Sequence, residues 1–177
     1  MKKILVILVA LSFYAYANQN FDYAVKHLFE FEGGDKIDKS IGSLHSRYGI
    51  TIPTLKRYNK NLTLYTITED QAKDLVYKLY WLEYDLDRFM DKRVALLIMD
   101  FVYNSNPTNA IKVMEKAIGG EKDGKLSVGE VAKINYMGYK TFAPIYVNAR
   151  LNYLKSLKIW HRFGKGLERR VTTLGNL

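Results

Sequence analysis

A short apolar segment in the middle of the chain limits the fold more than any other feature. Between Val94 and Tyr103 the residues are apolar on every side except at Asp100. A helix of this composition is buried all round, and the segment is much shorter than the roughly 20 residues that cross a bilayer. Other helices of the chain must pack around it, so we predict a mainly α fold with this helix at its centre.

Asp100 is the polar exception in that helix, and a buried carboxylate is costly unless it has a partner. Asn104 lies one turn later on the same face. The two side chains either belong to a buried hydrogen-bond network that orients the core, or line a cleft and contact a substrate. We favour the network for Asp100 and keep Asn104 as a candidate substrate contact.

One helix is predicted before this central segment and one after it. Thr68 and Gln71 form a capping box before a helical apolar pattern that should run through Trp81 into Tyr84. After the central segment, Pro107 is placed to sit in the first turn of a helix over Asn109–Ile118, which Gly119-Gly120 would end.

The last third of the chain is also predicted to be helical. Ser127 and Glu130 form a second capping box, for a helix that reaches about Met137. Pro144 then begins a long pattern with one apolar face. That face carries Val147, Leu151, Leu154, Leu157 and Trp160.

One carboxylate stands out near the N-terminus. The amphipathic segment from Phe21 to Phe31 is followed directly by Glu32 and then by Gly33-Gly34. A carboxyl group at a helix end beside glycines can reach a cleft, and partial withdrawal from water helps such a group to hold a proton for acid catalysis. Glu32 is therefore a candidate general acid. The alternative is a surface residue at a helix C-terminus.

The stretch that follows Glu32 differs from the rest of the chain. From Asp35 to Thr51 there is no helical periodicity, and the Gly, Ser and Asp content favours a loop or a small β-hairpin.

The first residues predict export. Lys2-Lys3, the apolar run from Ile4 to Tyr14 and the small residues Ala15-Tyr16-Ala17 have the pattern of a signal peptide. The apolar run is too short to span a bilayer comfortably, so we expect cleavage before Asn18 rather than a permanent anchor. The mature protein is then expected to be periplasmic or secreted.

Size and composition fit one globular domain without cofactors. Removal of residues 1–17 leaves 160 of 177 residues, and it removes two lysines and no acid, so the formal charge falls from +9 to +7. The chain has no cysteine, which excludes disulfides and thiolate metal sites. His27, His45 and His161 lie far apart, and Gly119 occupies the first ligand position of an EF-hand-like stretch, so no metal is expected.

Five groups of residues, taken in order, resemble a known family. They are Glu32-Gly33-Gly34, Tyr48-Gly49-Ile50-Thr51, Ala72 with Tyr77 to Trp81, Asp100-Phe101 with Asn104, and Asp123-Gly124 followed by Gly129. Together they resemble the glycoside hydrolase family of bacterial and phage N-acetylmuramidases that open with an E-G-G-Y motif. The resemblance implies a lysozyme-like helical fold that cleaves the β-1,4 bond between N-acetylmuramic acid and N-acetylglucosamine, with Glu32 as the catalytic acid.

The resemblance extends from about residue 21 to residue 170 and implies two regions. Residues 18–120 correspond to the lysozyme-like catalytic region. Residues 121–177 correspond to a helical tail that resembles the peptidoglycan-binding end of the family and packs on the same domain. The departures lie in the loop after the acid, where Asp35 replaces an aromatic residue and residues 43–51 lack the family's pair of glycines. A catalytically inactive wall-binding module therefore stays an alternative.

Further site residues are expected around Glu32. A glycosidase usually needs a second carboxylate, and Asp38 is the first candidate, with Asp35 behind it. Ser46 and Thr51 can hold a water through their hydroxyl groups. The residues predicted to contact substrate are Asp35, Ser46, Tyr48, Thr51, Tyr103 and Asn104.

The tail suggests the kind of partner. Between Tyr146 and Arg170 it carries Arg150, Lys155, Lys158, Arg162, Lys165, Arg169 and Arg170 against the single acid Glu168. Such a stretch suits a polyanion, and for an exported protein the carboxylate-bearing peptides of the bacterial wall fit better than nucleic acid. A solvated helix face is the alternative. We expect a monomer that acts on peptidoglycan glycan strands, with no nucleic-acid partner and no stable membrane insertion.

Three functions remain open from the sequence. The first is a hydrolytic muramidase. The second is a lytic transglycosylase, which acts on the same bond with a single Glu and one of the sugar's own groups in place of water. The third is the inactive wall-binding module.

Overall fold

The structure is a computed structural model that describes residues 19–39 and 45–177. The predicted signal peptide, residues 1–17, lies outside the described residues. In the part that is described, no helix has the length and apolar character to cross a membrane.

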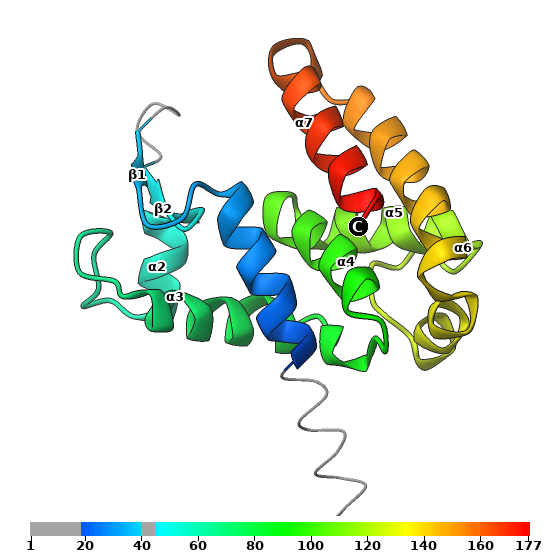
Figure 1. Ribbon diagram of the computed structural model, residues 1–177, viewed down its shortest axis with the longest axis horizontal. Coiled ribbons are helices and arrows are strands. Elements are labelled where there is room, and N and C mark those ends of the chain that lie inside the picture. Colours follow the sequence, from blue (N-terminus) through cyan, green and yellow to red (C-terminus); the bar gives the residue numbers. More distant parts are fainter. Residues whose placement is uncertain (1–18, 40–44) are drawn as a thin grey trace, which may run out of the picture.

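The fold is mainly helical with one small sheet, as predicted (Figure 1). The first helix occupies residues 19–31. It is followed by β1 (Ile37–Asp38), β2 (Ser46–Arg47), β3 (Ile50–Thr51), α2 (Ile52–Tyr58), α3 (Glu69–Val76), the π-helical turn η1 (Tyr77–Leu82), the 3-10 helix η2 (Leu86–Arg88), α4 (Lys92–Asn104), α5 (Pro107–Ile118), α6 (Val128–Lys155) and α7 (Trp160–Gly175).

Helix α4 is the central helix. Every residue from Val94 to Val102 is buried, Asp100 included. Helices α5, α6 and α7 and the turns η1 and η2 all pack against it. The buried central helix predicted from the apolar segment is therefore confirmed.

The capping boxes predicted from the sequence are both present. At the start of α3 the Gln71 backbone N–H donates to Thr68 Oγ1 at 3.2 Å, and the Thr68 N–H donates to Gln71 Oε1 at 3.0 Å. The helical segment continues through η1, where Trp81 is fully buried, and ends at Leu82, just before the predicted end at Tyr84. Helix α5 begins at Pro107 and is capped by Gly119 in the left-handed region, as predicted.

Helix α6 departs from the prediction at its middle. The part that begins after Ser127 ends at Met137, as expected, because Gly138 has a non-helical backbone (φ 66°, ψ 170°). The second part starts directly after Gly138, before the predicted start at Pro144. Pro144 thus lies inside the helix, near the start of this second part, where it removes one backbone donor.

The C-terminal apolar pattern belongs to two helices and not to one. Helix α6 ends at Lys155 and α7 begins at Trp160, so the two form an antiparallel hairpin (Figure 1). The connecting turn has its own three-residue backbone bonds, Leu157 to Leu154 and Trp160 to Leu157, at 3.1 and 3.0 Å. These bonds keep the helical spacing of apolar residues through the turn, and no Gly or Pro marks the reversal, which is why the sequence pattern looked continuous.

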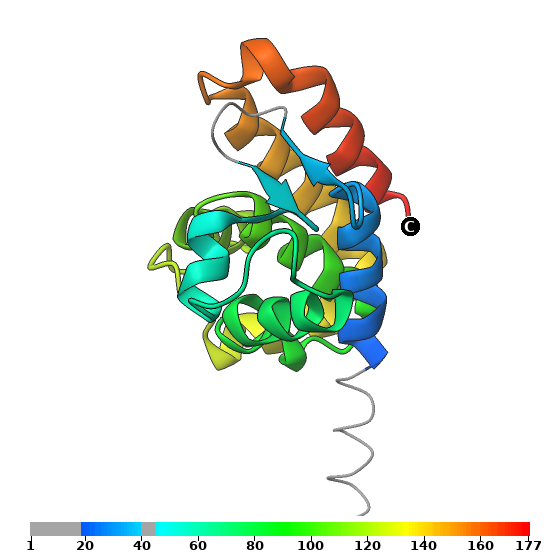
Figure 2. The same ribbon diagram turned by 90° about the vertical axis from the view of Figure 1, so that its left-hand side faces the viewer.

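The stretch between the first helix and α2 forms the small sheet, so of the two predicted alternatives, a loop or a small β-hairpin, the structure shows the second. Its strands are antiparallel in the order β1-β2-β3. The sheet lies beside the last turn of the first helix (Figure 2). This arrangement places the hairpin next to Glu32.

Candidate active site

Glu32 lies where the first helix ends, as its sequence context predicted. Its N–H still donates to Leu28 O at 3.0 Å, and the Gly34 N–H reaches back to Phe29 O at 2.9 Å. Gly33 and Gly34 have φ values of 80° and 65°. This left-handed backbone ends the helix, so the carboxylate projects from the helix end.

The turn between β2 and β3 closes against the Glu32 side chain. Tyr48 and Gly49 form its centre with φ values of 57° and 75°, the backbone that tight two-residue hairpins need. A Cβ atom at Gly49 would lie 2.7 Å from both Cγ and Oε2 of Glu32. The absence of a side chain at Gly49 therefore makes room for the carboxylate.

Two hydrogen bonds hold the backbone of the same turn at Tyr48. The Tyr48 N–H donates to Gly34 O at 3.0 Å, and the Tyr103 hydroxyl donates to Tyr48 O at 3.0 Å. Tyr48 lacks the conformational freedom of glycine, so its left-handed backbone costs about 1–2 kcal/mol. The two hydrogen bonds, together with burial of its ring, hold it there.

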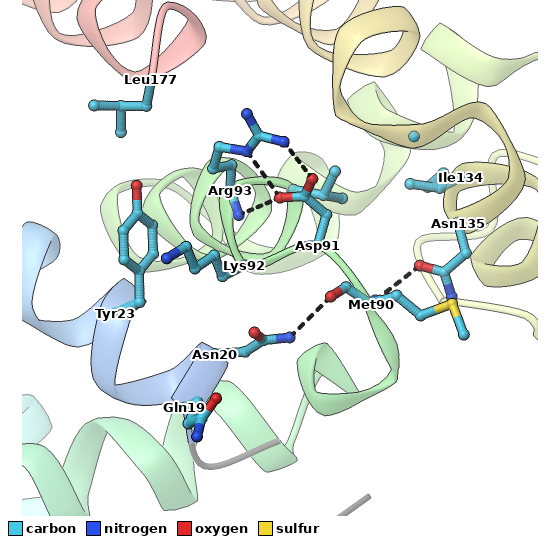
Figure 3. Close-up of a pocket in the computed structure, with 12 residues that line it drawn as sticks. Gln19, Asn20, Tyr23, Met90, Asp91, Lys92, Arg93, Ile134, Asn135 and Leu177 are labelled. Atoms are coloured by element: carbon cyan, nitrogen blue, oxygen red, sulfur yellow. Dashed lines mark hydrogen bonds and ion pairs between the residues drawn. The ribbon is translucent and has the colours of Figure 1, made fainter. Parts of the chain in front are cut away.

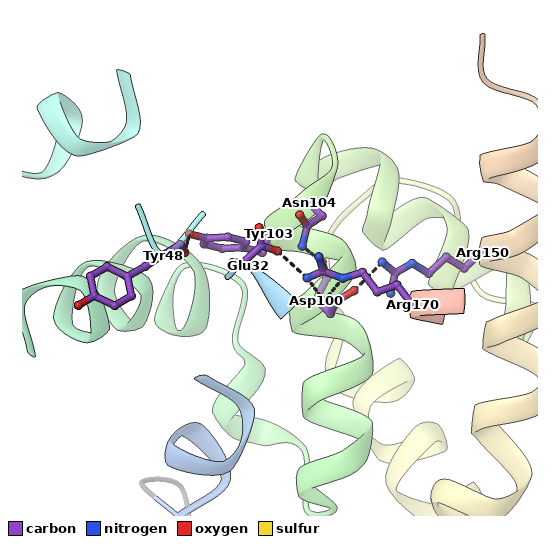
Figure 4. Close-up of polar contacts among 7 residues, drawn as sticks. All are labelled: Glu32, Tyr48, Asp100, Tyr103, Asn104, Arg150 and Arg170. Carbon is purple, nitrogen blue, oxygen red and sulfur yellow. Dashed lines mark hydrogen bonds and ion pairs between the residues drawn. The ribbon is translucent and has the colours of Figure 1, made fainter. Parts of the chain in front are cut away.

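The Glu32 carboxylate is ion-paired with a residue from the far end of the chain. Arg170 Nη2 in α7 donates to Glu32 Oε1 at 2.6 Å (Figure 4). The side chains of Glu32 and Arg170 are 15% and 16% exposed. The carboxylate is thus mostly shielded, with a limited opening to solvent.

Arg170 also contacts Asp100, which supplies the buried partner that Asp100 needs. Arg170 Nε donates to Asp100 Oδ1 at 2.8 Å, and Arg150 Nη2 from α6 donates to Asp100 Oδ2 at 2.6 Å. The Asp100 side chain is fully buried. The predicted buried network around Asp100 is therefore present, and its cations come from the C-terminal hairpin.

Electrostatics within this cluster are balanced. Burial by itself raises the pKa of Asp100, but the charges of Arg150 and Arg170 outweigh it and hold that pKa below its usual value. Glu32 and Asp100 supply two carboxylates against the two guanidinium groups, so the cluster is formally neutral. Arg150 stacks over the Phe101 ring at 4.5 Å, and Arg170 lies over the Phe31 ring at 5.1 Å.

Three of the predicted site residues form one row across the sheet. Asp38 in β1 pairs with Ser46 in β2, and Ser46 pairs with Thr51 in β3. Directly opposed residues in antiparallel strands place their side chains on the same face. Asp38 is exposed, and Thr51 Oγ1 is 3.1 Å from Thr54 Oγ1. This set, Asp38, Ser46 and Thr51, is called the sheet row below.

Asp35 lies outside that row. Its side chain is exposed in the loop after Gly34, and its backbone carbonyl accepts a hydrogen bond from Arg47 Nε at 2.8 Å. This backbone contact is a structural one, and a contact between the Asp35 side chain and substrate stays a prediction.

The aromatic and amide candidates are placed differently from one another. Tyr48 is only 4% exposed, and its ring packs on that of Phe29 with the centroids 4.9 Å apart and points away from Glu32 (Figure 4). Tyr48 is linked to the site through its backbone carbonyl, which accepts a hydrogen bond from the Tyr103 hydroxyl. Tyr103 is half-buried, and burial and the charge of Glu32 raise the pKa of its hydroxyl. Asn104 is exposed, and its amide donates to Asp100 O at 3.0 Å.

An apolar groove runs from this cluster along α7. It has a volume of about 530 Å³ and is lined by residues that include Phe31, Phe163, Leu167, Arg169 and Arg170. Phe31 precedes the acid in the chain, and Arg170 contacts it, so this groove begins beside Glu32.

A larger cavity, of about 820 Å³, lies at the other end of the first helix (Figure 3). Several of its polar groups are paired with one another. Asn20 donates to Met90 O at 3.4 Å, and the Met90 N–H donates to Asn135 Oδ1 at 2.9 Å. Arg93 pairs with Asp91 at 2.7 Å. It begins at Gln19, whereas Glu32 follows the opposite end of that helix.

Among residues 19–39 and 45–177, no group of three or more His, Asp or Glu side chains could hold a metal ion. The EF-hand-like stretch that begins at Gly119 is held by Glu115 of α5. The Glu115 carboxylate accepts hydrogen bonds from the backbone N–H groups of Gly124 and Lys125 at 2.9 and 3.0 Å. These bonds account for the loop conformation.

Sequence reasoning missed Arg150 and Arg170 as members of the site. Both were counted only as part of the basic tail. The available signal was the need of Asp100 for a cationic partner, but nothing in the sequence shows which of the tail's arginines reaches it.

Comparison with known proteins supports the resemblance read from the sequence. Residues 25–105, which include Glu32, the sheet row and α4, match the family model described as Glycosyl hydrolase 108. Among solved structures, SagA of Brucella abortus is 26% identical to this chain, with a TM-score of 0.78 over 90% of this chain and 93% of that one. Comparison with curated proteins finds no match. The resemblance read from the sequence and the predicted fold class are confirmed: residues 25–105 match the glycosyl hydrolase 108 domain, a family of glycosidases that act on glycans, and the fold is like that of SagA.

Proposed function

We propose that the protein is an exported peptidoglycan hydrolase, an N-acetylmuramidase that cleaves the β-1,4 bond between N-acetylmuramic acid and N-acetylglucosamine. One observation carries the proposal. The Glu of the E-G-G motif, inside the glycosyl hydrolase 108 segment, presents a carboxylate that is 15% exposed between a hairpin turn and the start of an apolar groove.

In this mechanism Glu32 donates a proton to the glycosidic oxygen as the bond to the anomeric carbon breaks. Its shielded position suits this role, because a transfer to a sugar oxygen is more effective where bulk water is largely excluded. Gly49 keeps the space above the carboxylate free of a side chain.

The second carboxylate is assigned to Asp38, with Asp35 as its alternative. Asp100 does not fit this role, because it is fully buried and bonded to two arginines. Asp38 shares the sheet row with the hydroxyls of Ser46 and Thr51. A row of one carboxylate and two hydroxyl groups can hold a water for attack on the anomeric carbon or bind the sugar's hydroxyl groups.

The remaining parts of the proposal come from the sequence. Residues 1–17 direct export and are removed, the basic tail of residues 121–177 contributes affinity for the wall, and Tyr103 and Asn104 contact the glycan beside Glu32. The boundary near residue 120 does not separate the site, because Arg150 and Arg170 from the tail meet Asp100 and Glu32.

The placement of the acids also favours a second candidate. Glu32 is the carboxylate next to the groove, because it follows Phe31 and pairs with Arg170, which both line it. Asp100 is inaccessible, and Asp38 is exposed on the sheet. A lytic transglycosylase needs a single acid at the scissile bond, so the same geometry suits that reaction.

Digestion of purified sacculi tests these functions. We expect wild-type protein to release fragments with reducing N-acetylmuramic acid ends, whereas 1,6-anhydro ends would assign the transglycosylase. Glu32→Gln should lower the rate at least about 10²-fold, the usual minimum for general acid catalysis. Glu30→Gln, an exposed acid two residues earlier, is the matched control and should retain the rate. Binding of sacculi without digestion by the wild type would instead establish the wall-binding module.

A further inference from the structure

We propose that Arg170 is a positioning residue that fixes the Glu32 carboxylate and, together with Asp100, sets the pH range in which Glu32 can act as an acid. This inference rests on the proposed function. It assigns a part in the reaction to the C-terminal helix, whose sequence resemblance pointed only to wall binding.

The geometry shows that Arg170 is held independently of Glu32. Its Nε and Nη2 atoms both donate to Asp100 Oδ1, at 2.8 and 2.5 Å, and Arg150 holds the other oxygen of Asp100 at 2.6 Å. Asp100 lies in the fully buried part of α4. Arg170 is therefore anchored on the core, and the Nη2 atom that reaches Glu32 Oε1 has a defined position.

Packing limits Arg170 further. Its guanidinium lies over the Phe31 ring at 5.1 Å, and Phe31 immediately precedes Glu32. Two independent contacts, one with the ring and one with the carboxylate, thus join α7 to the end of the first helix. A pair of carboxylates bridged by one planar guanidinium needs arginine, because the compact lysine ammonium lacks the rigid, extended fork of N–H donors.

An ion pair with Arg170 has a chemical consequence for an acid catalyst. The pair involves the ionised carboxylate, whereas the proposed reaction needs the protonated one. Arg170 must therefore be balanced, and Asp100 on its other side supplies the opposite charge. Glu32 and Asp100 thus lie on two sides of the same guanidinium group.

Three helices supply the charged and titratable groups that lie in the cluster with Glu32, and the sheet adds Asp38, the proposed second carboxylate, which is exposed in the sheet row. Arg170 from α7 is in direct contact, Asp100 and Tyr103 come from α4, and Arg150 from α6 lies behind Asp100. The Tyr103 hydroxyl stays protonated in the working range because its pKa is raised. Gly49, on the sheet side, adds no charge. Arg170 and Asp100 are thus the neighbours whose removal changes the local charge in opposite directions.

A purely structural role predicts a different pattern. If Arg170 only docks α7 on α4, its loss lowers stability without moving the pH dependence of the folded enzyme. If it only binds wall anions, Arg169, its exposed neighbour on α7, should be equivalent to it.

The experiment measures kcat and KM against pH on soluble peptidoglycan fragments, with folding verified by circular dichroism. Arg170→Gln should lower kcat at least about threefold and move the alkaline limb of the kcat profile to higher pH, because Glu32 keeps its proton longer without the adjacent cation. Asp100→Asn should move the same limb to lower pH, because it leaves Arg170 unbalanced. Opposite displacements are the result that a structural role does not give.

Two further variants complete the test. Arg169→Gln removes one positive charge from the same helix without touching Glu32, so the limb should stay in place whatever happens to KM. Arg170→Lys keeps the charge but loses the bridge, so kcat should fall while the limb stays near its wild-type position. It also serves as the deciding variant if Arg170→Gln does not fold, since an unchanged kcat in Arg170→Lys would overturn the inference.

The outcomes separate this inference from the proposed function. If Glu32→Gln keeps full activity, the proposed function fails and the inference fails with it. If Glu32→Gln is inactive but the limb does not move in Arg170→Gln and Asp100→Asn, the function stands and the inference alone is wrong.

Discussion

The two sides of the candidate site are built in opposite ways. The core side, Glu32 with Arg170, Asp100 and Arg150, is shielded and joined by charge-assisted hydrogen bonds between helices far apart in the sequence. The sheet row lies on strands of two residues each and has an exposed acid. The acid is therefore held rigidly by long-range contacts, whereas the side proposed to supply water and sugar contacts depends on short local strands.

The largest effect should come from breaking the core side at its centre. Asp100→Ala leaves Arg150 and Arg170 buried without their carboxylate, so the free energy of unfolding should fall by about 3–5 kcal/mol. Urea denaturation measures it. Asp87→Ala removes an exposed acid from η2 and should change stability by less than about 0.5 kcal/mol. Equal losses in the two variants would show that the cluster does not hold the core together.

Gly49→Ala tests the contact where the two sides meet. The new methyl group would lie 2.7 Å from the Glu32 side chain, on a backbone with φ 75°. We expect a loss of about 1–3 kcal/mol from clash and backbone strain, together with a large loss of activity as the carboxylate is displaced.

Gly33→Ala is the matched variant for that contact. Gly33 also has a left-handed backbone, φ 80°, but a Cβ atom there meets nothing within 4 Å. It should show the backbone strain of about 1–2 kcal/mol without the clash. If both variants lose activity in proportion to stability alone, Gly49 has no specific part in placing Glu32.

The core side should also be sensitive to acid. Because the folded pKa of Asp100 lies below its ordinary value of 3.8, the unfolded state binds a proton first as the pH falls. The stability that Asp100 contributes is therefore fully present above pH 3.8 and is lost as the pH drops through the lower, folded value. Urea midpoints measured from pH 6 downward should decline more steeply for wild type than for Asp100→Asn, and parallel declines would argue against the buried ion pair.

The smallest effect on stability is expected on the sheet side. Ser46→Ala should change the free energy of unfolding by less than about 0.5 kcal/mol, because Ser46 is half-buried on a short strand. If the sheet row binds water or sugar, turnover of soluble fragments should nevertheless fall. Full activity in this variant would remove Ser46 from the site.

The same contrast explains what the sequence predicted. The capping boxes of Thr68 and Ser127, the Gly119 cap and the helix end at Glu32 depend on neighbours within a few residues, and all were predicted. The central helix was predicted because a short helix that is apolar on every side is buried in the core.

The sequence predicted that Asp100 needs a long-range contact but not which residue makes it. The need of Asp100 for a partner follows from its own environment, but Arg170 is 70 positions away and three other arginines of the tail were equally plausible from the sequence. The reversal between α6 and α7 was missed because its turn keeps helical spacing. Tyr48 was expected near a glycan, yet the sequence does not show that its ring turns into the core while its carbonyl serves the site.

The central claim, that Glu32 donates the proton to the leaving sugar, is tested most directly by varying the leaving group. Glu32→Gln and wild type are compared on glycan strands and on an aryl glycoside of the same sugar with an activated phenol, which departs without protonation. We expect the variant to lose at least about 10²-fold on the glycan and far less on the aryl glycoside. An equal loss on both substrates would contradict the assignment of Glu32 as the general acid.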